Sequence, residues 1–164
     1  MNATYKQILW NQFGAAIDML ENAMTVCPEE IWGSSAGFSE FWYIAYHTLF
    51  WLDLYLSGSV ENFAPPAPFG LSELDPEGIM PEKIYTKEEL LNYLEHSRKK
   101  CKTFIQNLTD EIAVKPYKFG SIELRLLELL IYNMRHVQHH TAQLNLILRQ
   151  KIDSAPRWVK QARN

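Results

Sequence analysis

The chain has 164 residues, a size at which one compact domain is the common outcome and no disulfide or metal is needed merely to fold it. Apolar residues make up 47% and charged residues 21%, which excludes intrinsic disorder, and 7 glycines and 8 prolines exclude a collagen-like or low-complexity chain. The net charge of −3 is divided between residues 1–82, with one base and 11 acids, and residues 83–164, with 15 bases and 8 acids. No basic run exceeds three residues and no recognition motif accompanies it, so we expect no nucleic-acid partner.

The cysteines and the start of the chain both bear on the cellular compartment. Cys27 and Cys101 are too few for a disulfide framework, which fits a reducing environment. Polar residues interrupt the apolar ones throughout the first 20 positions, so that stretch does not have the pattern of a signal peptide. We therefore expect a cytoplasmic protein.

Two long helices are predicted in the first half of the chain. Apolar residues from Leu9 to Met24 recur at helical spacing, and this helix should end before Cys27 because Pro28 follows. The segment PEEIW reads as a single helical turn. Ser39 is the expected N-cap of a second helix over residues 40–57.

The second helix is unusually aromatic, since eight of the 21 aromatic residues fall between Phe38 and Tyr55. Three polar residues inside or beside it, Glu40, His47 and Asp53, argue against a membrane span, so no membrane partner is expected. A helix that is apolar on all sides must be covered on several of them. One groove of a bundle covers too little, so we expect a homodimer.

Residues 58–85 form the least regular stretch, with five prolines. A connection of this length is often a crossover or a lid, and we expect it to be the most mobile part of the chain and to cover the mouth of the site. A third helix begins at Thr86, where Thr86 and Glu89 make a capping box.

A break at residues 116–120 separates the third helix from a fourth, which Ser121 should cap and which runs to about Arg149. The short tail after it should fold back, with Trp158 against the body. Alternation of period two is not sustained in any segment, so no sheet is expected. The prediction is an all-α four-helix bundle with a long crossover between helices 2 and 3, which lets those two helices run parallel.

Histidines in the fourth helix carry the clearest chemical signal. His136 and His140 are one turn apart, about 6 Å along the axis, and lie on the same helical face. That face continues an apolar stripe, which would direct both imidazoles inward toward one ion. His139 falls nearer the edge, so geometry ranks the pair His136/His140 above His136/His139.

A third ligand has to come from another helix, and His47 is the natural choice because it lies among apolar residues where an unpaired imidazole is costly. By contrast, His96 has charged neighbours and is expected at the surface. Val137 occupies the position where a zinc-protease motif has its glutamate, so the pattern includes no built-in base. Cys27 and Cys101 are expected to act as small apolar residues rather than as ligands or nucleophiles.

The sequence HVQHHTAQLNLILR, a mid-helix His47 about 90 residues earlier and the CPEEIW entry before that helix together resemble the DinB/YfiT-like family of metal-dependent enzymes. The resemblance covers nearly the whole chain and implies one DinB-like helical bundle domain over residues 1–164. It further implies a homodimer in which His47, His136 and His140 hold a divalent ion such as zinc or nickel. Thr141-Ala142 stands where many members have Arg-Gly, which leaves the type of substrate open.

Two functions of different classes follow. The first is a metal-dependent enzyme of hydrolase or thiol-dependent transferase type, since some relatives use a low-molecular-weight thiol and three histidines leave a coordination position free. The second is a non-catalytic metal-binding helical dimer with a structural or stress-regulatory role. The polar groups best placed to assist are Tyr43, Asn133 and Gln143, but the sequence assigns no catalytic residue.

Overall fold

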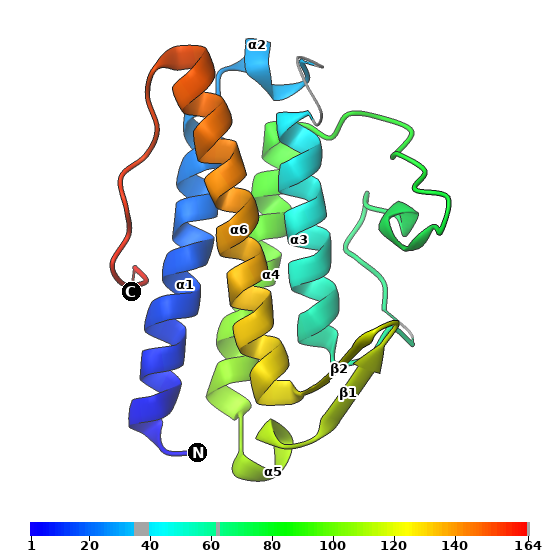
Figure 1. Cartoon of the computed structure of the whole chain (residues 1–164), viewed down its shortest axis with the longest axis vertical. Coiled ribbons are helices and arrows are strands. Elements are labelled where there is room, and N and C mark those ends of the chain that lie inside the picture. Colours follow the sequence, from blue (N-terminus) through cyan, green and yellow to red (C-terminus); the bar gives the residue numbers. More distant parts are fainter. Residues whose placement is uncertain (35–39, 62, 164) are drawn as a thin grey trace.

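Four long helices form the body of the molecule (Figure 1). The computed structural model describes residues 1–34, 40–61 and 63–163. The long helices are α1 (Ala3–Val26), α3 (Phe41–Ser57), α4 (Lys87–Asn107) and α6 (Leu126–Ile152). Shorter elements lie between them: α2 (Glu29–Trp32), the 3-10 turn η1 (Ser72–Leu74), α5 (Asp110–Ala113), and the strands β1 (Pro116–Phe119) and β2 (Ile122–Arg125). The predicted all-α four-helix bundle is confirmed.

The helix ends have local chemical causes. The side chain of Asn2 accepts a hydrogen bond from the backbone of Tyr5 at 3.0 Å and caps α1, which ends at Val26, two residues before Pro28. The predicted capping box of α4 is present, with Thr86 and Glu89 bonding each other's backbone N–H. At the C-terminal end of α3, Gly58 adopts φ 67°, a left-handed conformation that glycine tolerates without strain. The expected cap Ser39 lies outside the described residues.

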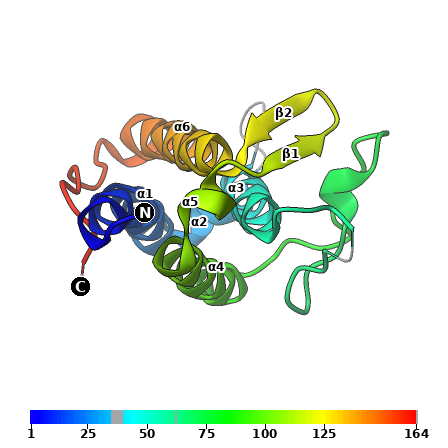
Figure 2. The ribbon, with the colours of Figure 1, turned by 90° about the horizontal axis from the view of Figure 1, so that it is seen from below.

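The long crossover sets the direction of the helices. Helices α1 and α6 run one way, and α3 and α4 run the other way, so the two helices joined by the crossover are parallel (Figure 1). Each of α1 and α3 packs against both α4 and α6. The view along the bundle shows the crossover and the β1–β2 hairpin projecting on the same side as α3 (Figure 2). His47, one of the predicted metal ligands, belongs to α3.

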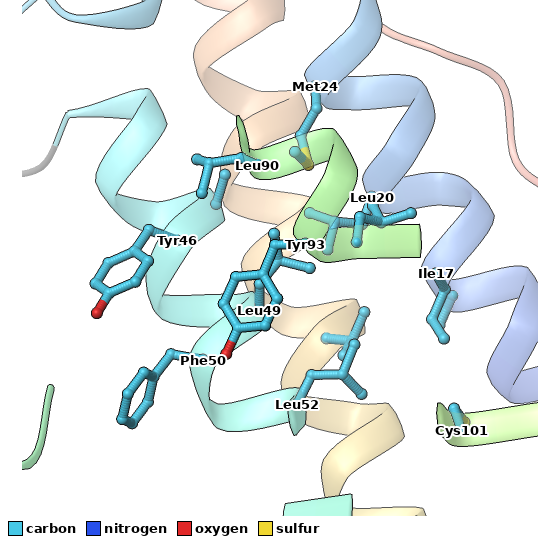
Figure 3. Close-up of a cluster of buried hydrophobic side chains, with 14 of the residues drawn as sticks. Ile17, Leu20, Met24, Tyr46, Leu49, Phe50, Leu52, Leu90, Tyr93 and Cys101 are labelled. Carbon is cyan, nitrogen blue, oxygen red and sulfur yellow. The ribbon is translucent and has the colours of Figure 1, made fainter. Parts of the chain in front are cut away.

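The main core fills the space among the four helices. Ile17, Leu20 and Met24 of α1 face Leu49 and Leu52 of α3, with Leu90 and Cys101 of α4 beside them (Figure 3). All of these side chains are buried. Tyr46 and Phe50 of α3 point to the side away from the α1 residues (Figure 3), where Phe69 and Phe63 of the crossover contact them.

The aromatic residues of α3 are covered by the chain's own crossover. Phe69 stacks on Tyr46 with ring centroids 5.9 Å apart, and Phe63 meets Phe50 edge-on at 5.3 Å. The hydroxyl of Tyr46 donates to the backbone carbonyl of Gly70 at 3.2 Å. Because the monomer itself covers this helix, the aromatic excess no longer argues for a dimer. The mobility of residues 58–85 stays a prediction.

None of the helices in the described part of the chain is both long and apolar enough to cross a membrane. The mean hydropathy of the whole chain is −0.23. The sequence predicts no membrane span in the aromatic helix because of its polar residues. Of these, Glu40 is the N-cap residue of α3 and Asp53 lies inside the helix.

The start of the fourth long helix differs from the prediction. Residues 116–125 form an antiparallel hairpin instead of a helix capped by Ser121, with Tyr117 opposite Leu124 and Phe119 opposite Ile122. Gly120 takes φ 55° at the turn, and α6 begins only at Leu126. The expectation of no sheet and of a helix start at Ser121 was wrong, because two strands of four residues are too short to show a sustained period of two.

The placement of the tail also differs from the prediction. Trp158 is 68% exposed and does not pack on the body. The tail is held further along, where the backbone N–H of Ala162 donates to the Asn11 carbonyl at 2.8 Å and that of Arg163 donates to the Asp18 carboxylate at 2.8 Å. Asp18 is 1% exposed and also pairs with Arg98 of α4, so one buried carboxylate ties the tail and two helices together.

Gly14 makes this attachment possible, and its replacement should detach the tail. A Cβ at Gly14 would lie 2.5 Å from the Cβ of Ala162. Gly14→Ala is therefore expected to destabilise the protein by about 1–3 kcal/mol in chemical denaturation, although alanine is the better helix former. Ala162→Gly in the same chain removes the clashing atom and should restore part of the stability. If Gly14→Ala alone raises the free energy of unfolding, the tail does not dock as described.

Candidate metal centre

Three histidines from two helices converge at one point between α3 and α6. His47 lies in the middle of α3, and His136 and His140 lie one turn apart on α6. Their ring centroids are 4.5–5.3 Å apart, and one nitrogen from each ring lies within 4.8 Å of the others. No other group of three histidine, cysteine or acidic side chains gathers in this way among the described residues.

The cluster lies at the solvent edge of the α3–α6 groove rather than at the centre of the bundle. All three histidines are half-buried, and the side chain of His47 is 30% exposed. The central positions on α6 belong instead to fully buried residues such as Val137 and Leu144. The site is therefore accessible from outside, which a position deep among the four helices would prevent.

Glu73 orients His47 and was not identified from the sequence. Its Oε2 lies 2.6 Å from Nδ1 of His47 and accepts a hydrogen bond from Nε1 of Trp51 at 3.0 Å. The carboxylate comes from η1 in the crossover, and its side chain is only 4% exposed. Because the contact joins residues 26 positions apart through an irregular segment, no local pattern indicates it. The crossover thus reaches the site by one acidic side chain, and its covering of the mouth of the site stays a prediction.

Electrostatics keep this carboxylate charged. Burial favours a higher pKa for Glu73, but hydrogen bonds from His47, Tyr43 and Trp51 outweigh it and lower the pKa below its usual value. Burial of the Tyr43 phenol, together with the nearby charge of Glu73, raises the pKa of Tyr43 to about 12, so the phenol stays protonated. An ionised Glu73 fixes the His47 ring with its Nδ1 proton toward the carboxylate and leaves Nε2 free.

The two α6 histidines of the converging group, His136 and His140, are held in the neutral form. Burial, with His140 and His47 adding to it, lowers the pKa of His136 to about 3. Burial also lowers the pKa of His140, against the opposing effect of a 2.7 Å hydrogen bond between its Nδ1 and Oε1 of Gln143. Neutral imidazole is the form that coordinates a metal ion.

The structure separates the two possible pairs on α6. His140 belongs to the converging group and His139 does not. The ring of His139 lies on the exposed outer side, where its Nε2 is 3.4 Å from Nε2 of Gln143. The side-chain amide of Gln143 therefore connects His139 with His140, and Gln143 is not one of the predicted metal ligands.

Other residues singled out in the sequence lie elsewhere or have different roles. Asn133 is buried and donates from Nδ2 to the Leu52 carbonyl at 3.0 Å, which makes it a link between α6 and α3 rather than a group facing the site. His96 is exposed on α4, as predicted. Cys27 and Cys101 are buried with free thiols, and burial raises the pKa of each, of Cys27 to about 12. They behave as small apolar residues, not as thiolate ligands.

The donor set fits a divalent transition metal. Nε2 of His136 lies 3.4 Å from Nε2 of His47, and the Nδ1 atoms of His47 and His140 already have side-chain partners. Nδ1 of His136 is buried and has no hydrogen-bond partner among the described residues. Facing imidazole nitrogens with their outer nitrogens bonded to carboxylate or amide oxygens are the usual surroundings of zinc, nickel or iron in proteins.

Comparison with protein-family patterns relates the chain to a known superfamily. The sequence pattern described as the DinB superfamily matches residues 12–144, a stretch that contains His47, Glu73, His136 and His140. A search among curated proteins found no match for the chain.

Proposed function

The chain belongs to the DinB superfamily, and from this premise we propose that it is a divalent-metal-dependent enzyme whose ion is held by His47, His136 and His140. The observation that carries the proposal is the convergence of three ring nitrogens within 4.8 Å at an accessible edge of the bundle. Zinc and nickel are the ions proposed, because imidazole ligands suit both and both are implied by the family resemblance.

Three protein ligands with solvent on one side are typical of catalytic rather than structural zinc sites, which have four protein ligands. When bound, such an ion supplies Lewis acidity toward a water, a thiol or a substrate carbonyl. The residues of this chain supply the rest. Glu73 holds the tautomer of His47, Gln143 holds that of His140, and burial keeps His136 neutral.

The reaction we propose is a hydrolysis or a transfer that uses a low-molecular-weight thiol. No cysteine of the chain is available as the thiol, since both cysteines are buried and protonated. A thiol nucleophile would therefore enter from solution through the open side of the groove. A homodimer, also implied by the resemblance, and a cytoplasmic location, expected from the cysteine content, belong to the proposal. Light scattering measures the dimer against a monomer of 19.1 kDa.

One experiment distinguishes the enzyme from a non-catalytic metal-binding bundle. The metal-free protein is loaded with one equivalent of zinc or nickel and assayed with a panel of thiols and electrophiles, and with ester substrates in the absence of thiol. The proposal predicts turnover that depends on the ion and is lost in His136→Ala. Stoichiometric metal without turnover for either class of substrate would favour the structural or regulatory alternative.

Replacing Glu73 is expected to weaken zinc binding less than the loss of a histidine ligand would. Glu73→Gln replaces the charged partner of His47 by a neutral amide of the same shape, which should lower the affinity for zinc by roughly 10–100-fold, as is usual for such hydrogen-bond partners of ligands. Competition with a chromophoric chelator measures the affinity. Glu77→Gln, an exposed residue three positions after η1, is the matched control and should bind zinc like the parent. Equal affinities for the two variants would show that Glu73 does not support the site.

A further inference from the structure

A second apolar cluster lies beside the histidines, apart from the main core. Its buried centre is formed by Tyr55, Tyr117 and Leu129. Around this centre lie six apolar or aromatic side chains that are only partly buried; they are Trp51, Phe119, Ile122, Leu124, Leu126 and Tyr132. We call this group the hairpin cluster, because the β1–β2 hairpin supplies three of the six. A group of half-exposed apolar side chains next to a polar centre is the usual composition of a small-molecule site.

The hairpin cluster is continuous with the metal centre. The ring of Trp51 lies 6.2 Å from that of His47, and its Nε1 donates to Glu73. Phe119 of the hairpin lies 5.9 Å from Trp51. Trp51 therefore forms a chain of neighbouring rings between Phe119 of the hairpin and His47. The hairpin projects from the bundle beside α3 (Figure 2).

A second line of rings leads to the other helix. Tyr132 lies 5.6 Å from Tyr55, and Tyr55 lies 6.2 Å from His136. Tyr132 and His136 also share the lining of a cavity of about 510 Å³ on the outer side of α6. Space for a ligand thus exists next to a histidine ring and an aromatic ring together.

The charges near the centre do not favour a strongly charged ligand. Glu73 is already engaged by His47 and Trp51, and the hairpin residues Lys118 and Glu123 are exposed and pair with each other at 3.8 Å. Arg135 is the one lysine or arginine in the lining of the cavity, and it is exposed, where solvent screens its charge. Ring faces and edges, in contrast, are presented by Trp51, Phe119 and Tyr132.

We propose that the substrate of this site is a small molecule with an aromatic ring, which packs against the hairpin cluster while its polar group reaches the ion between the histidines. This inference rests on the proposed metal site. Aromatic side chains hold a ring through burial and through edge-to-face or offset-stacked contacts, so they favour a phenyl group over a methyl group of the same polar head.

The test compares two probes with the same metal-binding head, acetohydroxamate and benzohydroxamate, by calorimetric titration of the zinc-loaded protein. We expect benzohydroxamate to bind at least about tenfold more tightly, which is roughly 1.4 kcal/mol. Phe119→Ala, which touches no histidine, should reduce this preference to about threefold or less. Phe104→Ala removes a half-buried ring packed on the main core and is the matched control, which should keep the full preference.

The outcomes separate this inference from the metal site itself. Failure to take up zinc would overturn both. Zinc uptake with equal affinity for the two probes, or with no binding of either, would overturn the aromatic-substrate inference and leave the metal site standing. A preference that survives unchanged in Phe119→Ala and in Tyr132→Ala would also overturn it, because the ring would then bind elsewhere. Thermal unfolding of each variant checks that the fold is intact.

Discussion

Replacing His136 by alanine is expected to remove stoichiometric zinc, with an affinity roughly 1,000-fold weaker or more, about 4 kcal/mol. His136 faces His47 at 3.4 Å between ring nitrogens and belongs to the group of three on which the site depends. His47→Ala and His140→Ala should have effects of the same size, because each leaves only two imidazoles. The measurement is the zinc content after equilibration with one equivalent, followed by competition with a chelator.

Two control histidines make this test specific. His96→Ala should keep one ion per chain, since His96 is exposed on α4 away from the site. His139→Ala should also keep it, and this variant is the sharper control because His139 is next to His140 in sequence. Loss of zinc in His139→Ala with retention in His140→Ala would reverse the assignment of the pair on α6.

Replacing Lys100 by methionine is expected to destabilise the fold by about 3 kcal/mol, the size expected when a buried charge loses its partner. Asp53 of α3 is 1% exposed and pairs with the ammonium of Lys100 on α4. Lys100 also donates to the Ser57 hydroxyl at 2.7 Å. Without this ammonium, Asp53 keeps the 3.1 Å hydrogen bond from Tyr93 and a 3.8 Å contact with Nε2 of the exposed His96. The melting temperature should fall by roughly 6–12 °C.

The neighbouring lysine is the matched control. Lys99 is 75% exposed and pairs with Glu95 at 3.5 Å one turn away, so Lys99→Met should change stability by less than about 0.5 kcal/mol. Adding Asp53→Asn to Lys100→Met removes the stranded charge and should restore part of the loss. If Lys100→Met and Lys99→Met unfold at the same denaturant concentration, the buried pair contributes nothing measurable.

The helices were predictable because their signals are local. The capping box at Thr86 and Glu89, the proline after Cys27 and the helical spacing of apolar residues each act within a few positions of the chain. The ranking of His140 above His139 is of the same kind, since a position on the helical face decides it and the structure brings His140 into the group.

What could not be predicted depends on tertiary contacts. Glu73 becomes part of the site only because the crossover folds over α3, and nothing near residue 73 indicates His47 as its partner. The hairpin could not be predicted because strands of four residues are too short to show a sustained alternation of apolar and polar residues. The aromatic excess of α3 predicts that a second chain covers this helix, but the crossover of the same chain covers it with Phe63 and Phe69. Glu73, Phe63 and Phe69 all lie in the irregular crossover, well away in sequence from the α3 residues that they contact.

The most direct test of the central claim is the zinc X-ray absorption spectrum of the protein loaded with one equivalent. Three imidazole nitrogens are expected at about 2.0–2.1 Å, with the remaining scattering from light atoms and none from sulfur. Sulfur scattering at about 2.3 Å would place the ion at Cys27 or Cys101 instead, and fewer than three imidazoles, or no retained zinc, would contradict the assignment of His47, His136 and His140.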